Sequence, residues 1–313
     1  MFKYEGNRTY IMQRKVAQIG PATLMVSLPS KWAKRYGVKK GDEIEIKEAG
    51  KSLILNIDKV KNIERTSVDV SNLNERVIKW VLSALHKSGY DEIEVKYSGQ
   101  KTLKVIQDMI QNVLMGFAIM DQNDKIVVLR CVAQDVPTEF DAALRRAFLV
   151  TISLAENSLQ LIKNKNYQGL DGLISLEQTN NQLTNFCERI LNKHGLGNEK
   201  TNSFWYIIAW NLEKICDEYK YICTLKFNKP LDKNVLTYYE DTNSLLKDYY
   251  ELFYNFDINK AKELENRSED LEKNGKELIN KHNLIHYLLG VISGIRDFFA
   301  STIALNKIGN SPP

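Results

Sequence analysis

The pattern of apolar and polar positions changes twice along the chain and predicts three kinds of structure in succession. In the first 60 residues, apolar side chains recur at every second position, which predicts strands over Thr23–Leu28, Glu43–Lys47 and Ser52–Ile57. After Pro29, Ser30 can cap a short helix over Lys31–Tyr36, and Gly37 can end it. Lys40-Gly41-Asp42 and Ala49-Gly50-Lys51 are expected turns. So small a segment cannot close a core alone, so we expect residues 1–60 to form an obligate dimer.

Helices and strands alternate between Asn72 and Gln134. The apolar spacing predicts helices over Glu75–Lys87 and Lys101–Leu114, and strands over Glu92–Tyr97, Phe117–Met120 and Lys125–Val132. We find neither a glycine-rich phosphate loop nor a candidate catalytic triad in this segment. We therefore interpret residues 61–135 as a small α/β domain that serves as a spacer or a dimerisation module.

The strand pattern disappears beyond Pro137, and apolar residues recur at helical spacing. Six helices are predicted, over residues 138–165, 168–194, 200–226, 232–255, 257–281 and 282–306. Pro230 divides them into two groups of three, so we expect two three-helix bundles, over residues 136–229 and 230–308. The predicted fold class is multidomain: a β-rich N-terminal domain, a small α/β middle domain and an all-α C-terminal part.

Composition narrows the class of protein. Of the 313 residues, 43% are hydrophobic and 26% are charged, which is typical of an ordered globular chain. The apolar run Leu284–Ile295 is shorter than the roughly 20 residues of a membrane span, and Met1–Gln13 carries charges where a signal peptide would be apolar. We therefore expect a cytoplasmic protein without direct membrane insertion. The four cysteines are widely spread and form no C-x-x-C pair, which indicates buried free thiols.

Charge is unevenly distributed along the chain. Residues 1–60 carry twelve Lys or Arg and six Asp or Glu, a net charge of +6, whereas the remaining residues sum to −2. A local positive field attracts polyanions, so the N-terminal segment is the expected nucleic-acid surface. Solvated side chains on a small surface would give the same charge, and from charge alone this second interpretation is favoured.

The two predicted bundles contain an internal repeat. Leu176–Leu183 resembles Leu264–Leu271, and Leu212–Asp217 resembles Ile292–Asp297. Glu213 and Asp217 lie one turn apart beside an apolar row. Two helices that each offer such a pair could hold a hard cation, although the spacing is equally typical of solvated surface pairs. We interpret His282 and His286 as packing residues, because no H-E-x-x-H motif accompanies their spacing.

The N-terminal segment carries an ordered series of motifs. Arg14-Lys15-Val16 is followed by Gly20, by Val26–Ala33 and by Tyr36–Asp42. This series resembles the swapped-hairpin DNA-binding domain of the AbrB/SpoVT family, which implies a homodimer that binds double-stranded DNA. We expect Arg14 to be best placed to read a base edge. The residues expected to contact the phosphate backbone are Arg14, Lys15, Lys31, Lys34 and Arg35.

The paired bundles resemble PhoU, the phosphate-uptake regulator, and the combination with an AbrB-like head resembles archaeal phosphate regulators. PhoU-type bundles carry E-x-x-x-D motifs that bind metal in some members. Here Glu213–Asp217 keeps the motif, Glu265–Glu269 substitutes one carboxylate, and Glu177–Asn181 and Ser293–Asp297 each lose one. The resemblance thus implies a divalent or iron-type metal ion in the bundles. Its expected ligands are Glu177, Glu213, Asp217, Glu265, Glu269 and Asp297.

Three functions follow from these features. The first is a transcriptional regulator of phosphate uptake that binds DNA and relays phosphate status through its bundles. The alternative is an adaptor that negatively regulates a phosphate transporter or sensor kinase without binding DNA. A third, an enzyme with a di-metal centre at Glu177, Glu213 and Asp217, lacks a nearby histidine and an activated nucleophile. We therefore expect a protein that is not an enzyme.

Overall fold

A computed structural model of the chain describes residues 13–49, 52–56, 63–133, 136–196 and 199–309. The chain divides into two compact units, residues 1–62 and 63–313. The first contains short strands and one short helix, and the second is mostly helical, which confirms a multidomain protein with a small N-terminal strand region. The predicted turn at Gly50-Lys51 and the strand end at Ile57 lie outside the described residues.

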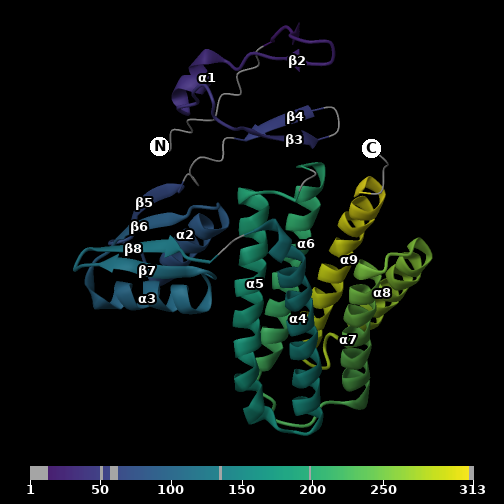
Figure 1. Cartoon of the computed structure of the whole chain (residues 1–313). Coiled ribbons are helices and arrows are strands. Elements are labelled where there is room, and N and C mark those ends of the chain that lie inside the picture. Colours follow the sequence, from purple (N-terminus) through teal and green to yellow (C-terminus); the bar gives the residue numbers. More distant parts are fainter. Residues whose placement is uncertain (1–12, 50–51, 57–62, 134–135, 197–198, 310–313) are drawn as a thin grey trace. The chain divides into compact units, whose positions relative to one another are not determined.

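Two antiparallel hairpins and one helix make up the first unit (Figure 1). Its elements are β1 (Ala17–Gln18), β2 (Leu24–Met25), α1 (Ser30–Arg35), β3 (Glu45–Ala49) and β4 (Ser52–Asn56). Of the strand predicted over Thr23–Leu28, only Leu24 and Met25 are paired. Their partners are Gln18 and Ala17, the two residues of β1. Helix α1 begins one residue before its predicted start. Pro29 takes the cap position, and the side chain of Ser30 makes no capping hydrogen bond.

The described residues of the first unit, 13–49 and 52–56, form no buried hydrophobic core. None of its described residues is buried. Ile19, Leu24 and Leu53 each keep 65–70% of their surface exposed. A single copy therefore leaves the apolar faces of both hairpins in contact with water.

A small α/β module opens the second unit. Its four-stranded sheet has the order β5-β6-β8-β7, in which β5 and β6 are parallel and the other neighbours are antiparallel. Buried side chains of the sheet, such as Ile93 and Leu129, share one core with those of the two helices, such as Leu82 and Ile106. The elements are β5 (Arg65–Asp69), α2 (Glu75–Lys87), β6 (Glu92–Lys96), α3 (Gly99–Asn112), β7 (Phe117–Gln122) and β8 (Ile126–Cys131).

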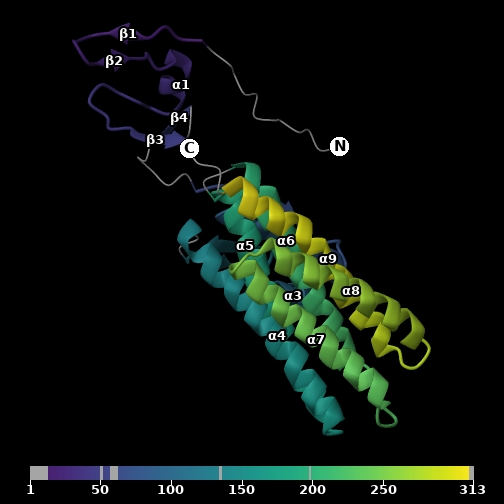
Figure 2. The ribbon, with the colours of Figure 1, turned by 90° about the vertical axis from the view of Figure 1, so that its right-hand side faces the viewer.

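Six long helices follow the α/β module (Figure 2). They are α4 (Phe140–Lys163), α5 (Ile174–Lys193), α6 (Glu199–Cys223), α7 (Lys233–Tyr254), α8 (Ile258–Leu278) and α9 (Leu284–Gly309). All six were predicted. The second was expected to start at residue 168, but Tyr167–Leu173 forms a 3-10 helix, and α5 begins only at Ile174.

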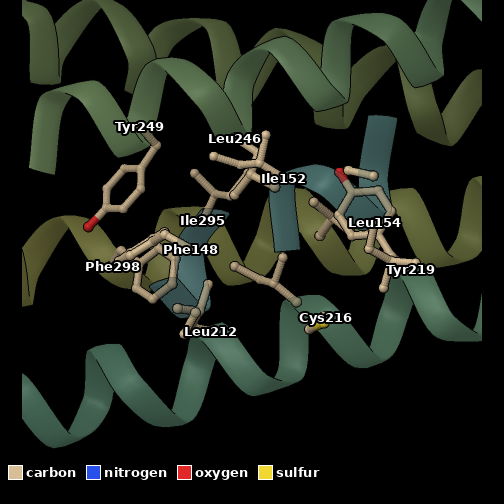
Figure 3. Packing of buried hydrophobic residues seen from close by; sticks show 14 of the residues in the cluster. Phe148, Ile152, Leu154, Leu212, Cys216, Tyr219, Leu246, Tyr249, Ile295 and Phe298 are labelled. Atoms are coloured by element: carbon tan, nitrogen blue, oxygen red, sulfur yellow. The ribbon is translucent and has the colours of Figure 1, made fainter. Parts of the chain in front are cut away.

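The six helices share one continuous core. Figure 3 shows Phe148 of α4, Leu212 of α6, Leu246 of α7 and Ile295 of α9 pointing toward one another. The core thus crosses the division at Pro230, and α6 makes its most extensive contacts with α9 of the other half. The two groups of three helices are therefore packed into a single helical body.

Helix α9 packs against α6, α7 and α8. Its segment Leu284–Asn306 is long and apolar enough to cross a membrane by length and composition alone. Its apolar side chains face the other helices instead, and Leu288 is fully buried. Gly290 and Gly294 let α6 come close, because a Cβ atom at either position would lie 2.7 Å from the side chain of Glu218 or Ile215. Somewhat less than half of this segment is buried inside the described structure.

A buried arginine joins the α/β module to the helical body. The side chain of Arg189 on α5 is fully buried and donates to the carbonyl oxygens of His86 (3.0 Å) and Tyr90 (2.7 Å). It also pairs with Asp91 at 3.3 Å and lies over the ring of Phe117. These acceptors include the carboxyl end of α2, where the helix dipole favours a cation. The module and the body thus pack as one unit.

Candidate nucleic-acid interface and bundle carboxylates

The basic residues predicted to contact DNA are all exposed in the first unit. Arg14 and Lys15 precede β1, separated from it by Val16. On α1, Lys31, Lys34 and Arg35 lie one turn apart, so they share one face of the helix, whereas Ala33 on the opposite side is half-buried. Within the part of the chain that the structure describes, none of the five forms an ion pair.

These cations can bind a polyanion without breaking existing contacts. Lys34 and Arg35 occupy the last turn of α1, where the negative end of the helix dipole stabilises them. A side chain without a carboxylate partner loses no ion pair when it meets a phosphate. The first unit therefore offers an available cationic face on α1 and a second basic pair, Arg14 and Lys15, before β1.

The predicted bundle carboxylates are brought together in two groups, each with a cation from the same body. In the first group, Lys220 Nζ on α6 donates to Glu177 Oε1 at 2.8 Å and to Asp217 Oδ1. Asn181 Nδ2 donates to the same Glu177 oxygen at 2.7 Å. Glu213 lies at the edge of this group, 3.5 Å from Lys214 Nζ.

Burial and pairing act in opposite directions on the first group. Burial raises the pKa of Glu177 above its ordinary value, and the nearby Lys220 partly opposes this. Burial lowers the pKa of Lys220, but its hydrogen bonds to Asp217 and Glu177 outweigh burial and raise it. Lys220 is therefore held in its charged form across the physiological range.

The second group lies between α8 and α9. Arg296 donates to Glu265 Oε1 at 2.8 Å and to Glu272 Oε2. Asp297 is exposed and lines a cavity of about 620 Å³ together with Glu265, Glu272 and Arg296. Glu269 is not part of this group, because it pairs with Lys273 at 3.0 Å on the exposed side of α8.

The residues present do not fit the metal cluster that the bundle resemblance implies. Among the described residues, no group of three or more His, Cys, Asp or Glu side chains is arranged to hold a metal ion. Sequence reasoning found the carboxylates but missed the cations Lys220 and Arg296 and the additional carboxylate Glu272. The spacing of Asp217 and Lys220, three residues apart on one helix, was the available signal.

Comparison with known protein families gives a match that lies mainly in the first unit. Residues 18–64 match the MazE antitoxin family, described as antidote-toxin recognition MazE, bacterial antitoxin. This match supports an AbrB-type domain in the first unit and the class of DNA-binding regulators or antitoxins. Domains of this type bind DNA and form dimers. No curated protein and no solved structure gives a match.

Proposed function

We propose that the protein is a dimeric DNA-binding transcriptional regulator. The observation that carries this proposal is the coincidence, in one unit, of the family match, the exposed basic residues and the uncovered apolar hairpins. Two copies that bury these hairpins against each other would gain a core that one copy lacks. The dimer would then present two sets of the cations Arg14, Lys15, Lys31, Lys34 and Arg35 to one duplex.

The helical body is proposed to sense or relay phosphate status. This part rests on the resemblance of the two groups of three helices to PhoU. In this function the body binds an effector or a phosphate transporter or sensor protein, and its state changes how the first unit binds DNA. The body is proposed to have no catalytic activity.

The DNA-binding part is tested with two charge-matched variants of the full-length chain. R14A/K34A removes two predicted phosphate contacts per subunit, whereas K39A/K40A removes two cations at a turn where we expect no contact. Binding to duplex DNA is measured by fluorescence anisotropy over a series of salt concentrations. R14A/K34A should reduce the log–log salt slope by roughly 4 per dimer, and K39A/K40A should leave it nearly unchanged. Equal effects of the two variants would contradict the assignment of these residues.

A protein-binding function is the second candidate, because the matched family is described by recognition of a toxin. In that case the first unit dimerises the chain and binds another protein instead of DNA. Wild-type protein that shows no salt-dependent duplex binding, yet remains a dimer by light scattering, would favour this candidate.

A further inference from the structure

The two carboxylate groups of the helical body share one kind of contact, although their cations come from different positions. In each group, the third helix of the half supplies a cation, and it contacts a glutamate of the second helix: Lys220 contacts Glu177, and Arg296 contacts Glu265. In the internal repeat, however, Lys220 corresponds to Ala300, and Arg296 corresponds to Cys216. The two halves therefore form the same contact, a cation of the third helix with a glutamate of the second, through different side chains from adjacent turns.

The first group is the more enclosed. The side chains of Glu177, Asp217 and Lys220 are 8%, 17% and 22% exposed, so water screens their charges little. Glu177 Oε1 already accepts two hydrogen bonds, from Lys220 and from Asn181. Lys214 Nζ lies 3.8 Å from Asp217 and 3.5 Å from Glu213, so the three carboxylates of this group are accompanied by two ammonium groups.

A metal ion would have to displace the ammonium group of Lys220. Hard cations bind carboxylate oxygens at about 2.0–2.6 Å, so an ion shared by Glu177 Oε1 and Asp217 Oδ1 would take the position of the Lys220 ammonium group. The same holds for Arg296, whose guanidinium nitrogens contact Glu265 and Glu272. In both groups a side chain takes the place that a bound cation would need.

We propose that Lys220 and Arg296 are built-in counter-cations that occupy the carboxylate sites of the helical body, so that the body is held together without a metal ion. Lys220 connects α5 to α6, and Arg296 connects α8 to α9. The residues that the bundle resemblance assigns to metal binding are then structural ion pairs. This inference concerns only the helical body and does not depend on whether the first unit binds DNA.

The proposal is tested first on the wild-type full-length chain. The thermal midpoint is measured by circular dichroism in EDTA, and then after dialysis into millimolar MnCl2, and Mn²⁺ binding is followed by electron paramagnetic resonance of the free ion. We expect no change in the midpoint and no saturable Mn²⁺ binding. A midpoint that falls in EDTA and is restored by MnCl2, or saturable Mn²⁺ binding, would overturn the proposal.

A lysine replacement on α6 tests the role of Lys220 directly. K220M leaves Glu177 and Asp217 without their shared cation, so its midpoint in EDTA should fall by about 5 °C or more. MnCl2 should now raise the midpoint of K220M, because the carboxylates have become accessible to a cation. K220R, which keeps the charge, should stay close to wild type.

Lys214 provides the matched control. It lies on the same helix, is 43% exposed and makes longer contacts of 3.5 and 3.8 Å. K214M should shift the midpoint by at most about 2 °C and should gain no response to MnCl2. The triple variant E177Q/K220M/D217N should lose the response that K220M gains. The proposal would be contradicted if K220M and K214M had the same thermal midpoint in EDTA and the same change of midpoint in MnCl2.

Discussion

His282 closes a stack of three aromatic rings at the loop between α8 and α9. Its ring lies 5.4 Å from that of Phe227 at an interplanar angle of 4°, and Phe227 lies 5.1 Å from Tyr167. The backbone N–H of Leu284 donates to His282 Nδ1 at 3.1 Å, so this nitrogen carries no proton. Burial, assisted by the positive charge of Lys229, lowers the pKa of His282 below its ordinary value.

The lowered pKa of His282 makes the protein less stable in mild acid. As the pH falls below about 6.5, the unfolded chain takes up the proton more readily than the folded chain, so the free energy of unfolding decreases. His282→Asn keeps an acceptor for the Leu284 N–H but cannot titrate. Urea unfolding near pH 7.5 and near pH 5 should show a smaller acid-induced loss for H282N than for wild type. The control is H286N, which replaces the exposed histidine four residues further along the chain. If H282N lost as much unfolding free energy between pH 7.5 and pH 5 as wild type does, the assignment to His282 would be contradicted.

At the scale of the elements, helix α5 contacts both the helical body and the α/β module. It packs against α4 and α6 within the helical body, and it also contacts α2 and α3 of the α/β module. Arg189 is the fully buried link between the two parts, and Asn192 on the same helix makes a more exposed contact, donating to the carbonyl oxygen of Lys87 at 2.9 Å. The α/β module is therefore fixed to the body by this helix.

Loss of the Arg189 guanidinium should loosen the α/β module. R189M leaves the buried carbonyl oxygens of His86 and Tyr90 without their donor and removes one of the two cations that contact Asp91, the other being Lys193. We therefore expect a loss of about 3–5 kcal/mol in unfolding free energy. N192A removes a hydrogen bond at the same seam and should cost about 1 kcal/mol. Chemical denaturation gives the free energies, and hydrogen exchange of the α2 amides reports the loosening. Unchanged exchange in α2 of R189M would show that Arg189 does not hold the module.

How far the elements could be predicted depends on whether their signals are local. The bounds of α2 agree with the prediction, because the apolar spacing and the ending at Ser88-Gly89 lie within the segment itself. Strand β5 was missed: of its five residues only Thr66 and Val68 are even half-buried, and its position comes from parallel pairing with the distant β6.

The same distinction between local and distant signals applies to the basic residues of the first unit and the carboxylates of the helical body. The carboxylates and basic residues can be found in the sequence, because their types and spacing carry the signal. The contact of Lys220 with Glu177 joins two helices, and no spacing along one helix reveals it. An i, i+3 lysine after Asp217 is equally typical of a solvated surface pair, which is why its role as a counter-cation emerges only from the tertiary structure.

At the scale of the whole molecule, the proposed function depends on assembly of two copies. The first unit has exposed apolar hairpins and a surplus of positive charge, whereas the second unit has its own continuous cores. A second copy that covers the hairpins is thus expected to complete the first unit and to double its basic surface. Each protomer would contribute the same five cations, so dimerisation and DNA binding are expected to be linked.

The salt dependence of duplex binding by the full-length protein tests this link most directly. Ten phosphate contacts, five from each protomer, predict a log–log slope of roughly −9, with one dimer bound per duplex site by sedimentation. Binding that is indifferent to salt, or binding by a stable monomer, would contradict a dimeric DNA-binding regulator.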